Sequence, residues 1–500
     1  MPFADMREFI ALLEKRGELL RIRDEVHWDL EIGAWLHKAI RTKTQPALLF
    51  EKVTGYPEGY TVAGMLVPNP TRWALALDFP EDISWSKMIE GLYERCRKPI
   101  DPVIVPTGPC KDVKDIGSAC NLLKFPIPHY IALDGGRYLG TWHCVVTKDP
   151  DTGERNVGMY RIMVHDRNSV GIFICPGEHA HFHYEKWKAL GKPMPVAITL
   201  GQDEVLPLNS LWSWPYGVDE YAMSGAMRGA PIELVKCETV DLEVPATAEI
   251  VVEGHMSLTE TRPEGPFGEY TGHMGALIKE GPVINVTAIT HRRNPIYRAQ
   301  LNGRPPCEYV SGVGISRAAG IFAASRMYGR PDIIAAYVLP NSPEETIAVS
   351  INKTYAGQAL DVANFVYEHG PAPMVKNVIV CDADIDVSDV GEVIWAVNCR
   401  VKASRDVRII PDCCDSPLDP AIVVEKRGLG DRMIIDATWP MEPEDRFPPR
   451  PEWDGQRFPQ LALPDEKTLE RIEGLWRTLK LPGQGPPPDR ARSGGRSFER

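Results

Sequence analysis

Proline is the residue that most restricts the fold of this chain, since 45 of its 500 residues are prolines, against an average share of about 5%. A proline ring lacks a backbone N–H and clashes with the preceding helical turn, so it is poorly tolerated inside helices and central strands. The sequence therefore argues against a helical bundle and favours many turns, strand edges and extended connections. Seven of the prolines fall between residues 440 and 464, which predicts a proline-rich arm.

Composition narrows the class of protein and its compartment. Apolar residues make up 43% and charged residues 25%, as in an average globular protein, and the length suggests about three domains. The net charge is −12, whereas nucleic-acid binding needs clustered Lys and Arg, so nucleic acid is not expected as a partner. No apolar run approaches the ~20 residues of a membrane span. The N-terminus lacks a signal-peptide pattern, and the 11 cysteines form no CxxC pair, which predicts a cytoplasmic protein with reduced thiols.

The order of expected helices and strands divides the chain into five segments. Strand–helix alternation comes first, many short apolar runs follow, and strand–helix alternation returns near residue 311. Such patterns predict an α/β region, then a barrel or sandwich, then a second α/β region. The expected segments are an N-terminal α/β domain (1–115), a β-rich domain (116–310), a C-terminal α/β domain (311–440), a proline-rich arm with a last helix (441–482) and a disordered tail (483–500).

Individual elements are predicted from apolar periodicity and from helix start and stop signals. Helices are expected at 4–17, 86–97, 178–190, 220–228, 315–327 and 390–397, the last beginning with a capping box of Asp389 and Glu392. Buried strands are expected in the C-terminal domain at 333–338, 378–381, 407–411 and 433–435. Earlier strands are expected at 47–50, 60–66, 142–147, 160–165, 170–175, 196–200, 248–253 and 283–289. The last helix should align Leu469, Ile472, Leu475, Trp476 and Leu479 on one face.

Two carboxylates bracket a tight turn at Glu264-Gly265-Pro266-Phe267-Gly268-Glu269. Glycine and proline favour a turn with an exposed backbone, and such a turn can direct both acids into one cavity. Their environments can then separate their pKa values, so that one carboxyl acts as an acid while the other stays ionised. The alternative is a surface loop with two solvated acids, which is the more common situation for acids in turns.

A basic residue lies in an apolar stretch, where Arg161 precedes the run Ile162-Met163-Val164. A buried arginine is rarely left unpaired because desolvating its charge is costly. Arg161 should therefore contact a carboxylate or an anionic ligand, bidentately where the geometry allows. A purely structural pair with an aspartate is equally compatible with the sequence.

Three histidines alternate at His179, His181 and His183. In a strand they would share one face and could chelate a metal ion. The residues that follow, up to 190, have a helical pattern, and in a helix the three side chains fan out. We expect one metal ligand among them and not three.

An aromatic stretch at 210–217 could form a stacking wall with backbone amides available to a phosphate, or an ordinary aromatic plug in a loop. Neither a GxGxxG nor a Walker A sequence occurs in the chain. Rossmann-type NAD enzymes and P-loop NTPases are therefore disfavoured.

Taken in order, these stretches resemble the UbiD family of prenylated-FMN-dependent decarboxylases, from the N-terminal helix to about residue 440. The resemblance is carried by Asn156-x4-Arg161, His165-Asp166, His179, Asp219-Glu220-Tyr221, Lys236-Cys237-Glu238, Val244-Pro245-Ala246-Thr247-Ala248-Glu249 and Glu264-Gly265-Pro266-Phe267-Gly268-Glu269. It implies a mixed α/β protein with a central split β-barrel that binds the cofactor and a C-terminal α/β domain for oligomerisation. It also favours functional roles for Arg161, Glu264 and Glu269.

In the resembled family an Arg–Glu–Glu trio surrounds the reactive ring of the cofactor, and Arg161, Glu264 and Glu269 match it. The resemblance implies that Arg161 holds the substrate carboxylate, that Glu264 orients Arg161 and stays ionised, and that Glu269 protonates the carbon that lost CO2. A proton donor at neutral pH needs a raised pKa, which an apolar pocket would supply. Loss of CO2 from a ring carbon also needs an electron sink that side chains lack, so a cofactor must supply it.

The same resemblance implies a divalent metal, Mn2+ or Mg2+, that ties the cofactor phosphate to Asn156, His179 and Glu220. An amide, an imidazole and a carboxylate form a mainly hard donor set that suits these ions. A K+ ion is implied near Ser210, Trp212 and Glu220. Arg432 is a departure, because family members often have a phosphate-binding lysine there. The implied cofactor-binding residues are Thr141, Asn156, Tyr160, Arg161, Glu178, His179, Ser210, Leu211, Trp212, Glu220 and Arg432.

The segment 302–308 differs from the subfamily that acts on cinnamic-type acids. The expected substrate is therefore an aromatic or heteroaromatic carboxylic acid, with an α,β-unsaturated acid less favoured, and the expected reaction is reversible release of CO2. The family implies a flavin prenyltransferase as cofactor supplier and a homodimer or homohexamer. Two other functions stay open: an FMN-dependent oxidoreductase of split-barrel type, and a metal hydrolase built on the three histidines.

Overall fold

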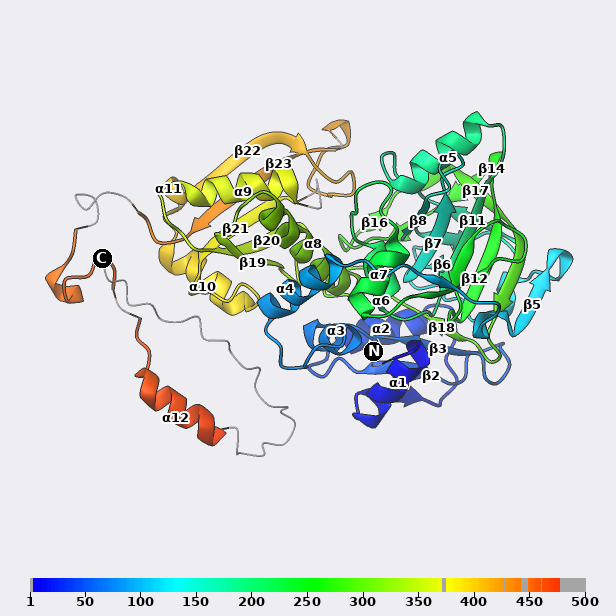
Figure 1. The fold of residues 1–500 in the computed structure, drawn as a ribbon, viewed down its shortest axis with the longest axis horizontal. Coiled ribbons are helices and arrows are strands. Elements are labelled where there is room, and N and C mark those ends of the chain that lie inside the picture. Colours follow the sequence, from blue (N-terminus) through cyan, green and yellow to red (C-terminus); the bar gives the residue numbers. More distant parts are fainter. Residues whose placement is uncertain (1–2, 371–374, 427, 442–447, 460, 477–500) are drawn as a thin grey trace.

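The computed structural model describes residues 3–370, 375–426, 428–441, 448–459 and 461–476. The main body has two lobes (Figure 1). The larger lobe contains the N-terminal helices and a large β-sheet, and the smaller lobe contains a sheet of five strands. The long helix α8 (Glu308–Met327) lies between them. This mixed α/β architecture confirms the predicted fold class.

The N-terminal segment is built on a four-stranded sheet. In order, its strands are β1 (Leu19–Ile22), β2 (Ala47–Phe50), β3 (Thr61–Gly64) and β18 (Ile296–Arg298). Its helices are α1 (Met6–Lys15), α2 (Glu31–Ile40), α3 (Pro70–Ala76) and α4 (Trp85–Cys96). Helix α1 begins where the Asp5 side chain accepts from the Glu8 N–H, and it buries an apolar stripe as predicted. Because β18 pairs in parallel with β3, the chain returns to this sheet long after leaving it.

The central segment forms a nine-stranded sheet that curls into a half-barrel (Figure 1). The strand order is β6 (Tyr138–Gly140), β9 (Ile162–Val164), β10 (Ser169–Ile172), β17 (Ile278–His291), β14 (Ile250–Glu264), β11 (Met194–Leu200), β7 (His143–Lys148) and β8 (Arg155–Gly158), with β5 (Val113–Ile116) also paired to β17. The two longest strands, β14 and β17, pair antiparallel with several bulges. Of the two architectures left open by the strand pattern, the structure shows the barrel type.

Short elements attach to the half-barrel and carry many of the candidate residues. They are α5 (His179–Ala189), α6 (Val205–Ser210), α7 (Glu220–Arg228), the sheet of β13 (Glu243–Pro245), β12 (Glu233–Lys236) and β4 (Val103–Ile104), and the hairpin of β15 (Phe267–Gly268) and β16 (Met274–Gly275). Asp219 caps the N-terminus of α7, since its side chain accepts from the Tyr221 N–H, and Gly229, where φ is +72°, caps the C-terminus. This capping fixes Glu220 as the first residue of the helix.

The C-terminal segment is a second α/β layer. Its strand order is β19 (Ile333–Val338), β20 (Thr346–Ile351), β21 (Asn377–Asp382), β23 (Leu429–Ala437) and β22 (Val407–Cys414), and its further helices are α9 (Gln358–His369), α10 (Val390–Arg400) and α11 (Ala403–Asp406). Asp389 caps α10 by accepting from two N–H groups. Glu392 instead accepts from the Asp386 N–H, so only half of the predicted capping box forms.

One buried strand of the C-terminal sheet was predicted wrongly. The run at 407–411 does form a strand, but β22 is at the edge of the sheet and pairs with β23 alone. Ile409 is 68% exposed. An apolar run shows that a segment suits a strand, but its burial depends on what packs against its faces: β19, at the opposite edge of the same sheet, is buried because α8 packs against it.

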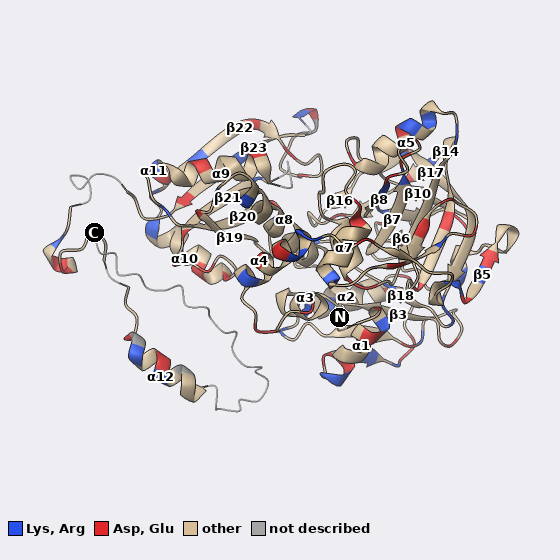
Figure 2. Ribbon diagram, viewed as in Figure 1, with Lys and Arg blue, Asp and Glu red and all other residues tan. Residues whose placement is uncertain are grey.

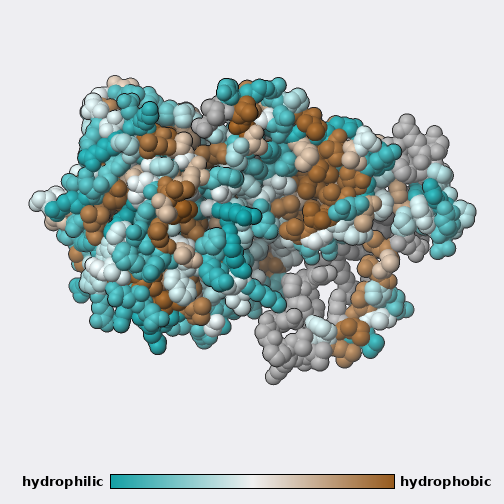
Figure 3. Space-filling view, turned by 180° about the vertical axis from the view of Figure 1, so that it is seen from behind, coloured by the Kyte–Doolittle hydropathy of each residue, from teal (hydrophilic) through white to brown (hydrophobic). Residues whose placement is uncertain are grey.

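Beyond this sheet, α12 (Glu466–Trp476) stands away from the main body (Figure 1). Its apolar side chains Leu469, Ile472, Leu475 and Trp476 are between 39% and 52% exposed. A patch of apolar residues also lies on the rear of the smaller lobe (Figure 3). The predicted face member Leu479 and the predicted tail at 483–500 lie outside the described residues. No helix in the described ranges is long and apolar enough to span a bilayer.

Charged residues of both signs are interspersed along the chain in both lobes (Figure 2), and one charged cluster is buried where the segments meet. Arg298 on β18 donates to Glu204 at 2.9 and 3.1 Å and to Glu308 at 2.8 and 3.2 Å. Glu204 precedes α6, and Glu308 begins α8. The three side chains are 1% to 2% exposed. This trio joins the N-terminal sheet, the half-barrel and the helix that leads to the smaller lobe.

Candidate active site

The acid-bearing turn continues directly from the longest strand of the half-barrel. Glu264 is the last residue of β14, and a cis peptide bond joins Gly265 to Pro266. Gly265 has a φ of +91°, which glycine adopts without strain. The chain then enters the β15–β16 hairpin, and Glu269 follows β15 directly. The turn thereby brings both carboxylates to the same arginine.

Arg161 lies in the connection between β8 and β9. The predicted strand at 160–165 included it, whereas β9 begins one residue later, at Ile162. Its Nε donates to the two oxygens of Glu264 at 3.0 and 3.2 Å, and its Nη2 donates to Glu264 Oε2 at 2.6 Å. Its Nη1 donates to Glu269 Oε1. One guanidinium therefore binds Glu264 through two nitrogens and Glu269 through one.

Burial and hydrogen bonding treat the two carboxylates unequally. The side chains of Arg161, Glu264 and Glu269 are 10%, 0% and 9% exposed, so neither acid belongs to a solvated surface loop. Burial raises the pKa of Glu269, and the charge and hydrogen bond of Arg161 oppose that rise. Glu264 also accepts from the Tyr138 hydroxyl at 3.2 Å. Glu269, with fewer donors, is the carboxyl better suited to carry a proton.

Aromatic rings and a buried aspartate complete the site, and the sequence analysis did not single them out. The guanidinium carbon of Arg161 is 4.7 Å from the ring centroid of Phe173 and 5.5 Å from that of Phe267. Asp134 accepts from the Gly268 N–H at 2.9 Å and thereby holds the turn. Phe267 lies inside the quoted motif, which was a usable signal. Asp134 and Phe173 come from distant connections and had no pattern to identify them.

Small residues allow this close approach. A Cβ on Gly275 would lie 2.9 Å from the Glu269 side chain and 3.2 Å from Arg161 Nη1. A Cβ on Gly135 would lie 2.0 Å from the Gly265 carbonyl oxygen. Glycine at 135 is therefore required, because its neighbour is backbone, whereas a side chain at 275 would displace Glu269 and Arg161.

A second group of predicted residues surrounds the N-terminus of α7. Glu220 Oε2 accepts from the Val157 N–H at 3.0 Å, which places this carboxyl beside Asn156 on β8. The Asn156 amide donates to the Tyr160 hydroxyl at 3.3 Å. Burial raises the pKa of Glu220 to about 8 and that of Glu178 to about 7. Nearby positive charge, such as a metal ion, would be needed to keep such carboxyls ionised.

His179 and His183, one turn apart on α5, both pack against the Tyr216 ring, so two of the three histidines share a face of the helix and the expectation that all three fan out is wrong. His183 Nδ1 is 2.9 Å from Thr147 Oγ1, and His181 Nδ1 is buried with no hydrogen-bond partner among the described residues. His179, at the start of α5, packs edge-on against Tyr216 with the centroids 5.3 Å apart. Burial lowers the pKa of His179, which favours the neutral form that binds metals. Within the described ranges no three His, Cys, Asp or Glu side chains are grouped to hold a metal ion.

The remaining predicted residues are divided between the two lobes. Trp212 stacks on Trp214 with the centroids 4.8 Å apart. Arg432 lies on β23 in the smaller lobe, with its guanidinium carbon 4.4 Å from the centroid of the Tyr367 ring. Arg432 therefore belongs to a different lobe from the other candidates. Thr141 lies two residues before β7, Ser210 is the last residue of α6, and Leu211 and Trp212 follow it.

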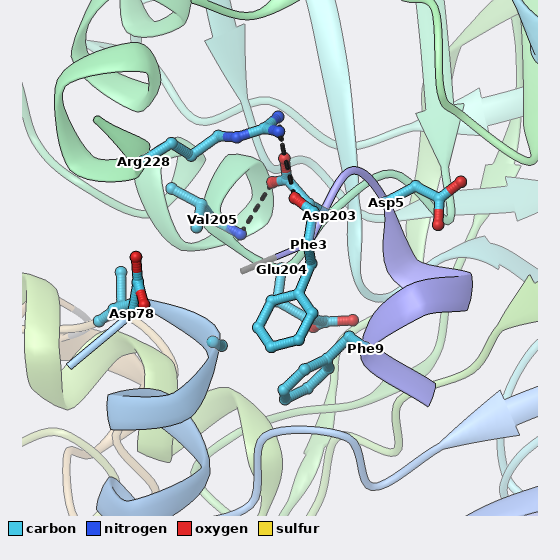
Figure 4. A pocket seen from close by; sticks show the side chains of 10 residues that line it. Phe3, Asp5, Phe9, Asp78, Asp203, Glu204, Val205 and Arg228 are labelled. Atoms are coloured by element: carbon cyan, nitrogen blue, oxygen red, sulfur yellow. Dashed lines mark hydrogen bonds and ion pairs between the residues drawn. The ribbon is translucent and has the colours of Figure 1, made fainter. Parts of the chain in front are cut away.

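Two hollows of the molecule lie apart from Arg161. The first, between α1 and the start of α6, has a volume of about 20 Å3, which is room for about one water molecule. Arg228 and Asp203 pair across it (Figure 4). The second has about 380 Å3 and includes Arg155 and Asp219. Successive strand residues point to opposite faces, so this hollow lies on the other face of β8 from Asn156.

Comparison with known proteins shows which family this architecture represents. The sequence matches the N-terminal, Rift-related and C-terminal domains of the 3-octaprenyl-4-hydroxybenzoate carboxy-lyase family at residues 10–103, 103–305 and 313–437. The chain belongs to the UbiD family. The predicted resemblance is thereby confirmed, and the chain is a carboxy-lyase of the UbiD class.

Relatives resemble this UbiD-family chain over nearly its whole length. HmfF of Pelotomaculum thermopropionicum, solved with FMN, is 33% identical with a TM-score of 0.82, and the match covers 94% of this chain and 99% of HmfF. The vanillic acid decarboxylase of Sedimentibacter hydroxybenzoicus is 32% identical with a TM-score of 0.85, covering 96% and 99%. An uncharacterised protein of Archaeoglobus fulgidus is 34% identical over 501 residues, covering 96% and 99%.

Proposed function

We propose that this protein decarboxylates an aromatic or heteroaromatic carboxylic acid with prenylated FMN as cofactor. The observation that carries the proposal is the buried Arg161, bound by two carboxylates of unequal environment. When bound, the prenylated flavin supplies the electron sink for loss of CO2. The relatives support this choice, because HmfF has been solved with FMN and an evolved dimeric form of HmfF with prFMN.

Arg161 is proposed to bind the substrate carboxylate. One positive charge lies between two carboxyl groups in a buried space, so the trio is neutral only when one carboxyl is protonated. An arriving anionic substrate competes with Glu269 for Arg161 Nη1, and this favours proton uptake by Glu269. Glu264 keeps Arg161 oriented through two nitrogens. Glu269 is then free to return its proton to the ring carbon that lost CO2.

The residues around α7 fit a divalent metal that holds the cofactor phosphate. Glu220 is 4% exposed, and its raised pKa reflects a buried carboxyl that lacks full compensation. The proposed ligands Asn156, His179 and Glu220 offer oxygen and one neutral imidazole nitrogen, which suit Mn2+ or Mg2+. We further propose that K+ binds near Ser210 and Trp212, and that Thr141, Tyr160, Glu178, Leu211 and Arg432 contact the cofactor.

We also propose partners and an assembly for this protein, as its family implies. A flavin prenyltransferase would supply the cofactor, and CO2 release would be reversible. The exposed apolar side chains of α12 and the apolar patch of the smaller lobe (Figure 3) support a homodimer or homohexamer formed through residues 311–440 and the arm.

The 11 cysteines are free thiols, which supports a cytoplasmic location. Residues 1–115, 116–310 and 311–440 are the proposed domains.

The test is to co-express the protein with a flavin prenyltransferase, identify the released cofactor by mass spectrometry, and follow CO2 release from a panel of ring carboxylic acids that includes vanillic acid. The proposal predicts prenylated FMN and substrate-dependent CO2. Recovery of unmodified FMN with NAD(P)H consumption and no CO2 would overturn it in favour of an oxidoreductase. Wild-type decarboxylation by Glu269→Gln would overturn the proton-donor assignment alone.

A further inference from the structure

The residue that follows the proposed proton donor reaches out of the half-barrel. Tyr270 directly follows Glu269, and its hydroxyl lies 3.2 Å from Ser416 Oγ. Ser416 follows β22 in the smaller lobe. The two residues are 7% and 1% exposed, so this hydrogen bond crosses between the lobes without competition from solvent.

The Tyr270 ring also packs against a residue of α8 that is itself hydrogen-bonded to the smaller lobe. Tyr309 on α8 packs against it with the centroids 5.8 Å apart. The Tyr309 hydroxyl donates to Glu344 Oε1 at 3.2 Å, and Arg317 donates to Glu344 Oε2 at 3.0 Å. Burial raises the pKa of Tyr270, so its hydroxyl stays protonated. Tyr270 is thus held by a pocket that the half-barrel does not provide.

Glu269 and Tyr270 belong to one short turn, residues 269–273, which is held by its own hydrogen bonds. The Glu269 N–H donates to the His273 carbonyl, and the Gly272 N–H donates to the Glu269 carbonyl, both at 2.9 Å. A Cβ on Gly272 would lie 2.9 Å from the Arg304 backbone. The turn therefore moves as one unit, and a shift of Tyr270 displaces Glu269 as well.

We infer that Tyr270 is a positioning residue, whose hydrogen bond to Ser416 holds Glu269 opposite Arg161 only while the smaller lobe is docked on the half-barrel. Proton delivery then depends on contact between the lobes. This inference rests on the proposed role of Glu269. It differs from plain packing, because it assigns the effect to one hydroxyl pair whose two members come from different lobes.

The experiment compares Tyr270→Phe, Ser416→Ala and the double variant, all as holoenzyme made with a flavin prenyltransferase. Each should lower kcat about tenfold with KM unchanged, since misplacing a reacting group by about 1 Å can cost up to ~10²-fold. The double variant should be no slower than either single variant, because the same bond is lost. The solvent deuterium isotope effect on kcat should increase as proton transfer becomes limiting. Tyr184→Phe is the control, because it removes one hydroxyl bond of 3.1 Å, to the Ser257 carbonyl, within the half-barrel; it should change none of these values.

Hydrogen exchange gives a readout independent of turnover. Tyr270→Phe and Ser416→Ala should each accelerate amide exchange in both 265–272 and 415–420, whereas Tyr184→Phe should not. Exchange confined to the mutated loop, or additive losses of kcat, would overturn the inference. If Glu269→Gln retains the wild-type rate, the proposed function of Glu269 fails instead, whatever the exchange result. If Glu269→Gln is inactive while Tyr270→Phe matches wild type in rate and exchange, only the positioning role fails.

Discussion

Two arginines in this molecule are each buried between two glutamates, and their surroundings differ. Arg298 lies where the segments meet, and both of its carboxylate partners receive further donors. Glu308 accepts from the N–H groups of Met65 and Val67 at 3.0 and 2.9 Å, and Glu204 accepts from Trp142 Nε1 at 2.7 Å. Arg161 lies beside the acid-bearing turn. Among the described residues, Arg161 is the only hydrogen-bond donor to the Glu269 carboxylate.

This difference shows how one arginine and two glutamates can form either a structural contact or a reactive site. In the Arg298 trio every carboxylate oxygen is hydrogen-bonded, so both acids are held in place by several donors and the geometry has no reason to change. In the Arg161 trio one carboxyl is held by a single contact, and it can take up a proton or yield its place to an anion. The first arrangement suits a structural joint, and the second suits chemistry.

The largest effect is expected from matched changes of one glutamate in each trio. Glu269→Gln should lower kcat about 10²- to 10⁴-fold, the usual contribution of general acid catalysis, while the protein stays folded. Glu308→Gln should leave the rate per folded molecule unchanged and lower the thermal midpoint. Steady-state kinetics and thermal unfolding of both variants would measure this. A comparable loss of kcat in both variants would erase the distinction between the trios.

Removing the arginine should separate the trios by stability. Arg298→Met leaves two buried carboxylates without their positively charged partner and should lower the free energy of unfolding by about 3–5 kcal/mol. Arg161→Met should cost less, because the Glu269 carboxylate has a single hydrogen-bond donor to lose and can be neutralised by a proton. Urea unfolding of the flavin-free variants gives both values. Equal losses would show that the Arg161 trio is as structural as the other.

A third buried carboxyl, without an arginine of its own, extends the comparison. Burial raises the pKa of Glu220 to about 8, so below that pH a metal ion must displace a proton from it. Mn2+ affinity of the flavin-free protein should fall by up to about tenfold for each pH unit below 8. Calorimetric titrations at several pH values would show this, and Glu220→Gln should bind weakly with little pH dependence. A wild-type affinity that stays constant between about pH 6 and pH 9 would contradict the assignment.

The smallest effects should come from the neutral donors of each trio. Tyr138→Phe removes the hydroxyl that donates to Glu264, and Trp142→Phe removes the N–H that donates to Glu204. Each lost bond should cost about 1–3 kcal/mol of unfolding free energy, with the shorter bond, 2.7 Å to Glu204 against 3.2 Å to Glu264, at the upper end. Only Tyr138→Phe should also change kcat, since only its partner orients Arg161. A rate change confined to Trp142→Phe would reverse the roles given to the two sites.

Much of the fold could be read from the sequence because secondary structure depends on local patterns. The strands at 47–50 and 333–338 and the helix at 220–228 were predicted with their observed bounds, since apolar periodicity and capping residues mark them directly. The edge position of β22 could not be read, because it depends on which strands lie beside it. The pairing of β18 with β3, from distant parts of the chain, had no local signal either.

For the site, the sequence by itself determined the residue types and the turn that carries them. The motif from Glu264 to Glu269 and the isolated Arg161 identified the trio through its resemblance to UbiD proteins. Only the tertiary structure decided that Tyr138 and Asp134 support it, that Arg298 repeats the trio elsewhere, and that Tyr270 meets Ser416. These contacts join residues up to 146 positions apart, and hydrogen bonds over such separations form only after packing has placed the segments together.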